Sequence, residues 1–139
     1  MPQAFPRFRP DDFLKVGRDI YDNFDKGQLE LRSGLESAWV RTAISRAYYG
    51  AFLFVNHELN FHFTGKDAHD RLVSELMRMS RPYKEIGSKL DALRRRRIEA
   101  DYLLSYIPSI PHLRWAVKTA EHIIENAKDI LKRRSTVRP

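Results

Sequence analysis

The stretch that decides the fold is the apolar run Ala47-Tyr-Tyr-Gly-Ala-Phe-Leu-Phe-Val55. It lies within the segment 33–59, which opens with the capping-box spacing Ser33-Gly-Leu-Glu36. A helix that is apolar on nearly every side is normally covered by other helices or by a second subunit. We therefore expect residues 33–59 to form a long helix at the centre of the fold.

Helix signals also dominate the rest of the chain. Further helices are expected over about 11–24, 64–79, 82–106 and 112–133. Asp11 is the expected N-cap of helix 11–24, and Pro82 suits the first turn of helix 82–106. Pro108 and Pro111 bracket the connection before helix 112–133. No stretch alternates with the period of a strand. The pattern predicts an all-α fold, an antiparallel up-and-down bundle of four to five helices.

Length and composition set the limits on domain number and chemistry. The 139 residues suit a single domain, 1–139, with an ordered core over about 11–133 and short basic tails. The lack of cysteine excludes disulfide frameworks, zinc–thiolate sites and cysteine catalysis. The longest apolar run is far shorter than the roughly 20 residues of a membrane helix, and no signal peptide is visible. We expect a soluble, cytoplasmic protein without a membrane partner.

The formal charge of +7 is unevenly distributed along the chain. Six of the 25 basic residues lie outside positions 11–131, so this body carries only +1. Within the body, however, residues 71–97 hold nine basic and three acidic side chains. Basic character is therefore local to this stretch, and Arg94, Arg95 and Arg96 within it form either phosphate contacts or a solvated helical face.

One arginine of the run Arg94-Arg-Arg-Arg97 interrupts the apolar pattern of its helix. At about 100° per residue, Arg97 falls within the apolar stripe, and Asp101 lies one turn further on the same side. Arg95 points the opposite way, and Arg94 and Arg96 lie on the flanks, so these three can reach solvent. The stripe itself consists of Ile86, Leu90, Leu93 and Leu104. Because an unpaired charge there is costly, we expect either a structural Arg97–Asp101 pair, including one across a dimer seam, or a polar site in a cleft between helices.

Two motifs resemble the HEPN family of prokaryotic helical domains. They are Arg41-Thr-Ala-Ile-Ser-Arg-Ala-Tyr-Tyr-Gly-Ala-Phe52 and Arg97-Ile-Glu-Ala-Asp-Tyr102, and the resemblance covers roughly residues 11–131. The resemblance implies an up-and-down helical bundle that forms a homodimer. It also implies the settings of such domains, which are antiviral RNA cleavage and toxin–antitoxin pairs, often beside a small nucleotidyltransferase.

The sequence departs from active HEPN ribonucleases in one respect. Those enzymes are similar to one another in carrying Arg, four to six residues and then His, whereas none of the five histidines here follows an Arg at that spacing. Arg97, Asp101 and Tyr102 stand in its place as candidate catalytic residues. A carboxylate cannot replace an imidazole as acid and base near neutral pH.

Two interpretations of function remain. The first is a HEPN-like protein that acts on or with RNA, including as a divergent ribonuclease. The second is a non-catalytic interaction module, such as a dimeric partner of a nucleotidyltransferase. The first assigns phosphate contacts to four arginines, Arg46, Arg94, Arg95 and Arg96.

The remaining polar residues match no metal or cofactor motif. The spacing of His57, His62 and His69 with Asp67 and Asp70 fits no zinc-binding helix pattern, and we interpret them as loop and surface polarity. No glycine-rich phosphate loop follows a strand. We therefore expect neither a metal nor a cofactor.

Overall fold

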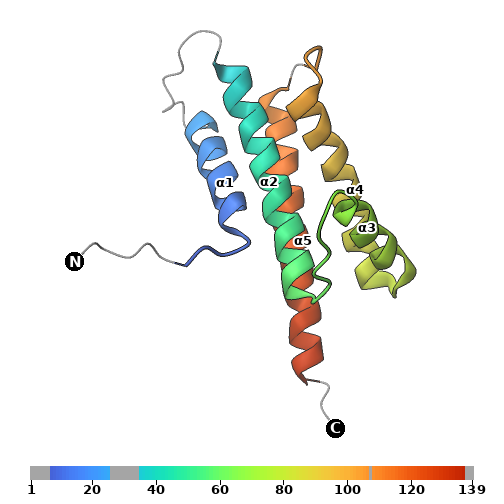
Figure 1. Cartoon of the computed structure of the whole chain (residues 1–139). Coiled ribbons are helices and arrows are strands. Elements are labelled where there is room, and N and C mark those ends of the chain that lie inside the picture. Colours follow the sequence, from blue (N-terminus) through green and yellow to red (C-terminus); the bar gives the residue numbers. More distant parts are fainter. Residues whose placement is uncertain (1–6, 26–34, 107, 137–139) are drawn as a thin grey trace, which may run out of the picture.

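The computed structural model describes residues 7–25, 35–106 and 108–136, which form five helices (Figure 1). The helices are α1 (Asp12–Asp25), α2 (Glu36–Glu58), α3 (Ala68–Arg78), α4 (Arg81–Tyr102) and α5 (Ile110–Thr136). Along the chain α1, α2, α4 and α5 alternate in direction, and the short α3 lies beside α4 (Figure 1). None of the described residues forms a strand. The predicted all-α bundle is confirmed.

Helix α2 is the central helix, as its apolar run predicted. It packs against α1, α4 and α5. Its most deeply buried side chains are Ala43, Ile44, Ala47, Tyr48, Ala51 and Val55. The described part of the helix begins at Glu36, and the predicted cap at Ser33 lies outside the described residues.

The structure corrects the predicted boundaries around α4 and α5. Pro82 lies in the first turn of α4, as predicted, but α4 ends at Tyr102 rather than near Tyr106. Leu104 is therefore beyond the helix and 92% exposed, instead of belonging to the apolar stripe. The other stripe residues, Ile86, Leu90 and Leu93, are fully buried. Pro111 belongs to the first turn of α5. Backbone N–H groups in the first turn have no acceptor within the helix, so the N–H that proline lacks is not needed there.

Arg41 of α2 fixes the turn that follows α4. Its Nη1 donates to the carbonyl oxygens of Ala100 at 2.9 Å and Leu103 at 3.0 Å, and its Nη2 donates to the carbonyl of Tyr106. Its Nε donates to Ser37 Oγ at 3.1 Å. Because the last carbonyls of a helix lack intrahelical partners, this guanidinium serves as a C-terminal cap. It holds the end of α4 against α2.

Glycines allow α1 and α2 to approach each other closely. A Cβ added to Gly17 would lie 2.8 Å from the carbonyl oxygen of Ala43, and one added to Gly50 would lie 2.6 Å from the backbone nitrogen of Leu14. Neither position has room for any side chain. The contact holds α1 along one side of α2, opposite α4 (Figure 1).

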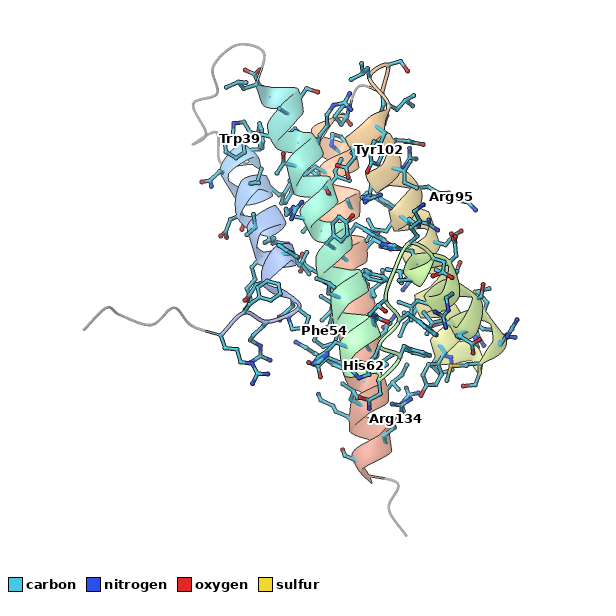
Figure 2. All side chains as sticks on the ribbon, viewed as in Figure 1. Trp39, Phe54, His62, Arg95, Tyr102 and Arg134 are labelled. Carbon is cyan, nitrogen blue, oxygen red and sulfur yellow. The ribbon has the colours of Figure 1, made fainter. Side chains whose placement is uncertain are left out.

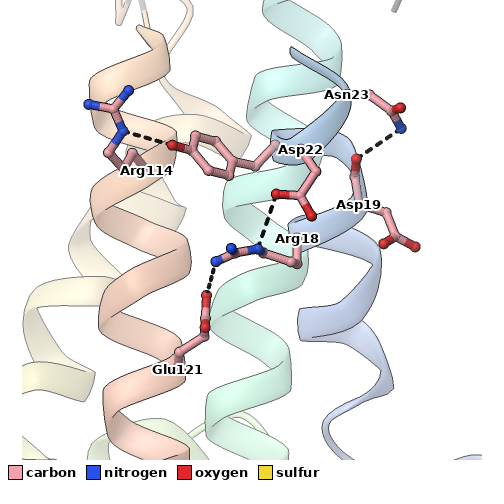
Figure 3. Close-up of polar contacts among 7 residues, drawn as sticks. Arg18, Asp19, Asp22, Asn23, Arg114 and Glu121 are labelled. Carbon is pink, nitrogen blue, oxygen red and sulfur yellow. Dashed lines mark hydrogen bonds and ion pairs between the residues drawn. The ribbon is translucent and has the colours of Figure 1, made fainter. Parts of the chain in front are cut away.

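Polar contacts join α1 to α5 (Figure 3). Arg18 Nη1 lies 2.6 Å from Glu121 Oε1, and its Nε lies 3.2 Å from Asp22 Oδ1. Higher in the same view, Arg114 Nε donates to the Tyr21 hydroxyl at 2.7 Å.

In the part of the chain that the structure describes, no helix has both the length and the apolar character to cross a membrane.

Candidate functional site

Arg97 faces the inside of the bundle, as the helical pattern predicted. Its side chain is only 14% exposed, and its Nε lies 3.1 Å from Asp101 Oδ2. Ser45 of α2 donates from Oγ to the same carboxylate oxygen at 3.2 Å. The ion pair within α4 is thereby tied to α2.

Three tyrosine rings surround the Arg97 guanidinium. Its Cζ lies 4.9 Å from the ring centre of Tyr49, 5.7 Å from that of Tyr102 and 5.8 Å from that of Tyr48. Its Nη2 also donates to the Tyr49 hydroxyl. A cation over an aromatic face gains electrostatic stabilisation of about 0.5–2 kcal/mol, so this buried charge is compensated by rings as well as by Asp101.

A second arginine lies against the same tyrosine. Arg46 of α2 has its Cζ 5.6 Å from the Tyr49 ring centre and 4.9 Å from that of Phe13 on α1. Unlike Arg97, it has no carboxylate partner among the residues that the structure describes. We call the following residues the arginine–tyrosine cluster: Arg46, Tyr49, Arg97, Asp101 and Tyr102. With two guanidinium groups and one carboxylate, the cluster has an excess of one positive charge.

The exposed arginines of α4 are paired with carboxylates of their own helix. Arg95 lies 2.9 Å from Asp91, and Arg96 lies 3.1 Å from Glu99. Their side chains are 76% and 44% exposed, respectively, which confirms that both face solvent. Figure 2 shows Arg95 projecting outward from α4. The positive charge of this run is therefore largely neutralised within the helix.

Arg94 does not face solvent as Arg95 and Arg96 do, which differs from the prediction. Its side chain is 25% exposed and forms an ion pair with Asp70 of α3. Helix α3 packs against this side of α4 and covers it. The helical pattern of α4 alone could not predict this neighbour.

His69 of α3 is a member of this region that sequence reasoning missed. Its ring stacks on Phe52 with 4.0 Å between ring centres, and its Nδ1 is hydrogen-bonded with the Tyr48 hydroxyl. Burial, together with the charges of Arg94 and Arg97, lowers the pKa of His69 to about 4. Burial raises the pKa of the Tyr48 hydroxyl above its ordinary value. The interpretation of His69 as surface polarity is wrong, because the packing of α3 carries it into the bundle.

This burial predicts a specific pH dependence of stability. The unfolded chain binds a proton at His69 near its ordinary pKa of about 6.5, whereas the folded chain resists protonation down to about pH 4. The contribution of uncharged His69 to the free energy of unfolding is therefore complete above about pH 6.5 and is lost as the pH falls towards 4. Between pH 7 and pH 5 the wild type should lose about 2 kcal/mol more unfolding free energy than His69→Gln, as measured by urea titration. Identical pH profiles for the two proteins would contradict this placement of His69.

Elsewhere in the described residues, neither a metal site nor a charged groove of clear preference is found. No three of the described His, Asp and Glu residues come close enough together to hold a metal ion. A groove of about 600 Å³ between α1 and α5 is lined by five carboxylates and four cationic side chains. Its charges nearly balance, so it provides no clear preference for an anion or a cation.

Comparison of this chain with protein-family models, with curated proteins and with solved structures found no match. A function for this chain is therefore inferred from the chemistry of the arginine–tyrosine cluster.

Proposed function

We propose that this protein is a HEPN-like, cytoplasmic helical bundle that acts on or with RNA in a toxin–antitoxin or defence setting. The observation that supports this most is Arg46, a guanidinium held between Phe13 and Tyr49 without a carboxylate partner among the described residues. A phosphate oxygen would supply the missing anion, because guanidinium groups bind phosphate through paired N–H donors.

Two further features of the surface suit RNA. Tyr102 is 70% exposed at the end of α4 (Figure 2), so part of its ring is free for a base to stack on. Arg95 and Arg96 can exchange their carboxylate partners for phosphates at little cost, because exposed ion pairs contribute only about 0–1 kcal/mol. Tyr102 extends the arginine–tyrosine cluster towards solvent, whereas Arg95 and Arg96 add positive charge on other sides of the same helix.

Replacing Arg46 with alanine should weaken the binding of a single-stranded RNA oligonucleotide about tenfold, the effect of losing one charge-assisted contact. The matched control is Arg81→Ala, which removes the same charge from an 89% exposed side chain at the other end of α4. Fluorescence anisotropy with labelled RNA measures both. Equal losses in the two variants would contradict the assignment of Arg46, and an affinity that does not fall with added salt would contradict phosphate recognition.

RNA cleavage is tested separately. In a cleavage reaction, Arg97 would stabilise the charge that develops on the phosphate. Total RNA is incubated with the wild type and with Arg97→Ala. Absence of cleavage by the wild type would contradict the ribonuclease interpretation, and undiminished cleavage by the variant would contradict the role of Arg97.

A different observation favours a second candidate, the non-catalytic interaction module. Four apolar side chains at the end of α4, those of Ile98, Tyr102, Leu103 and Leu104, are between 39% and 92% exposed. Neighbouring exposed apolar groups are typical of protein interfaces. In this alternative, the end of α4 binds a second copy of the chain or a nucleotidyltransferase.

The variant Leu104→Glu tests whether the end of α4 is a dimer interface. It introduces a charge at a 92% exposed position, so the fold itself should be unaffected. If the end of α4 is a dimer interface, light scattering should show a dimer for the wild type and a monomer for the variant. An unchanged mass for the variant would contradict a dimer interface at the end of α4, whatever the result of the RNA measurement.

A further inference from the structure

The contacts of Asp101 are those of an anion in a phosphate site. One of its carboxylate oxygens lies 3.1 Å from Arg97 Nε and 3.2 Å from Ser45 Oγ. Guanidinium and hydroxyl groups are the side chains that most often contact nucleic-acid phosphates. A guanidinium of α4 and a hydroxyl donor of α2 therefore lie next to a single anionic oxygen.

We propose that Asp101 is an internal competitor for phosphate. Its carboxylate occupies the anion position beside Arg97 and keeps the affinity of the arginine–tyrosine cluster for RNA low until the side chain turns away. This inference rests on the proposed function for the identity of the ligand, because it takes the phosphate to be that of RNA.

The geometry allows this carboxylate to leave. Asp101 is 26% exposed on its side chain, so it borders solvent, whereas Arg97 is 14% exposed and stays held by its three tyrosine rings. The pair is also imperfect, because Arg97 Nε makes no well-aligned hydrogen bond with any described residue. Replacing the carboxylate by a phosphate exchanges one anion for another, so the guanidinium is never left unpaired in the interior.

The charges around the site favour this exchange. Arg46 and Arg97 both lie against the Tyr49 ring, with their Cζ atoms 5.6 Å and 4.9 Å from its centre, so the cluster holds two positive charges against the one carboxylate of Asp101. A phosphate diester carries its negative charge on two non-bridging oxygens, and both can accept hydrogen bonds from guanidinium N–H groups.

The matched pair of variants is Asp101→Asn and Asp91→Asn. Each removes one carboxylate that lies four residues from an arginine on α4, but the partner of Asp91 is Arg95, which is 76% exposed. Asp101→Asn should tighten the binding of a single-stranded RNA oligonucleotide about tenfold, whereas Asp91→Asn should change it less than about threefold. Equal effects, or weaker binding by Asp101→Asn, would overturn the proposal.

Inorganic phosphate gives a readout that does not depend on RNA. Phosphate, compared with chloride at equal ionic strength, should raise the melting temperature of Asp101→Asn more than that of the wild type, because a ligand stabilises the state that binds it. Adding Arg97→Met to Asp101→Asn should abolish the difference. This comparison remains valid if Asp101→Asn is itself less stable, and an equal effect of phosphate on all three proteins would overturn the proposal.

The two measurements separate this inference from the proposed function. RNA binding by the wild type and Asp101→Asn with equal affinity would contradict the competitor role and support RNA as the ligand. A phosphate effect confined to Asp101→Asn, with no RNA binding by any variant, would support the competitor role and contradict RNA as the ligand.

Discussion

Replacement of Gly50 with alanine is expected to lower the free energy of unfolding by about 2 kcal/mol. The new Cβ would lie 2.6 Å from the backbone nitrogen of Leu14 and 2.8 Å from its Cβ. Both atoms belong to the packed part of α1, so the clash can be relieved only by moving α1 away from α2. The cost of this separation exceeds the gain of about 1 kcal/mol that alanine brings to a helix interior.

Gly87→Ala is the control for this prediction, because Gly87 is also a buried glycine within a helix. Its added Cβ would meet Leu76 Cβ at 3.0 Å and Met77 Sδ at 3.2 Å, and the Met77 side chain is 45% exposed and free to turn aside. The free energy of unfolding should change by less than about 1 kcal/mol, since the higher helix propensity of alanine offsets the cost of moving the neighbouring side chain. Urea unfolding of both variants gives the comparison, and a Gly50→Ala protein as stable as the wild type would contradict the close contact of α1 and α2.

Removal of the Arg41 side chain should have a comparable effect at the other end of the bundle. Arg41→Ala leaves the carbonyl oxygens of Ala100, Leu103 and Tyr106 without their guanidinium donor. Water can donate hydrogen bonds to some of these carbonyls. We therefore expect the free energy of unfolding to fall by about 2 kcal/mol, less than the summed free energies of the lost hydrogen bonds. The amide of Leu103, which donates to the carbonyl of Glu99 at 3.0 Å, should exchange with solvent deuterium faster.

Arg41→Lys and Ser37→Ala are the controls for this second prediction. The lysine keeps the charge but cannot reach three carbonyls in a fork, so it should recover only part of the stability. Ser37→Ala removes a single hydrogen bond of 3.1 Å on the exposed side and should cost less than about 1 kcal/mol. Amide exchange at the end of α4 that is unchanged in Arg41→Ala would contradict the capping role of Arg41.

The helices and the inward direction of Arg97 could be predicted because both follow from local periodicity. The apolar run of α2 requires neighbours on all sides, and the i, i+3, i+4 spacing on α4 places Arg97 among buried leucines whatever the rest of the chain does. Asp101 lies one helical turn further along, so the same periodicity predicts it as the partner of Arg97.

The remaining features depend on contacts between helices, which no local pattern contains. His69 enters the bundle, and Arg94 is covered, because α3 packs beside α4. The end of α4 is capped by Arg41, which lies on another helix. Likewise, Phe13 of α1 holds Arg46 only after the glycine contacts have brought α1 and α2 together.

The hydrogen bonds of Arg41 to the end of α4 also determine which motion moves the Asp101 carboxylate. They hold the carbonyls of Ala100 and Leu103, which lie on either side of Asp101, so the backbone there is fixed on both sides. Movement of Asp101 is thereby limited to rotation about its side-chain bonds, which takes about picoseconds to nanoseconds, and does not require unwinding of α4, which takes microseconds or longer. For the exchange of Asp101 with a phosphate that we propose, the rate of binding should therefore be set by diffusion rather than by a conformational step.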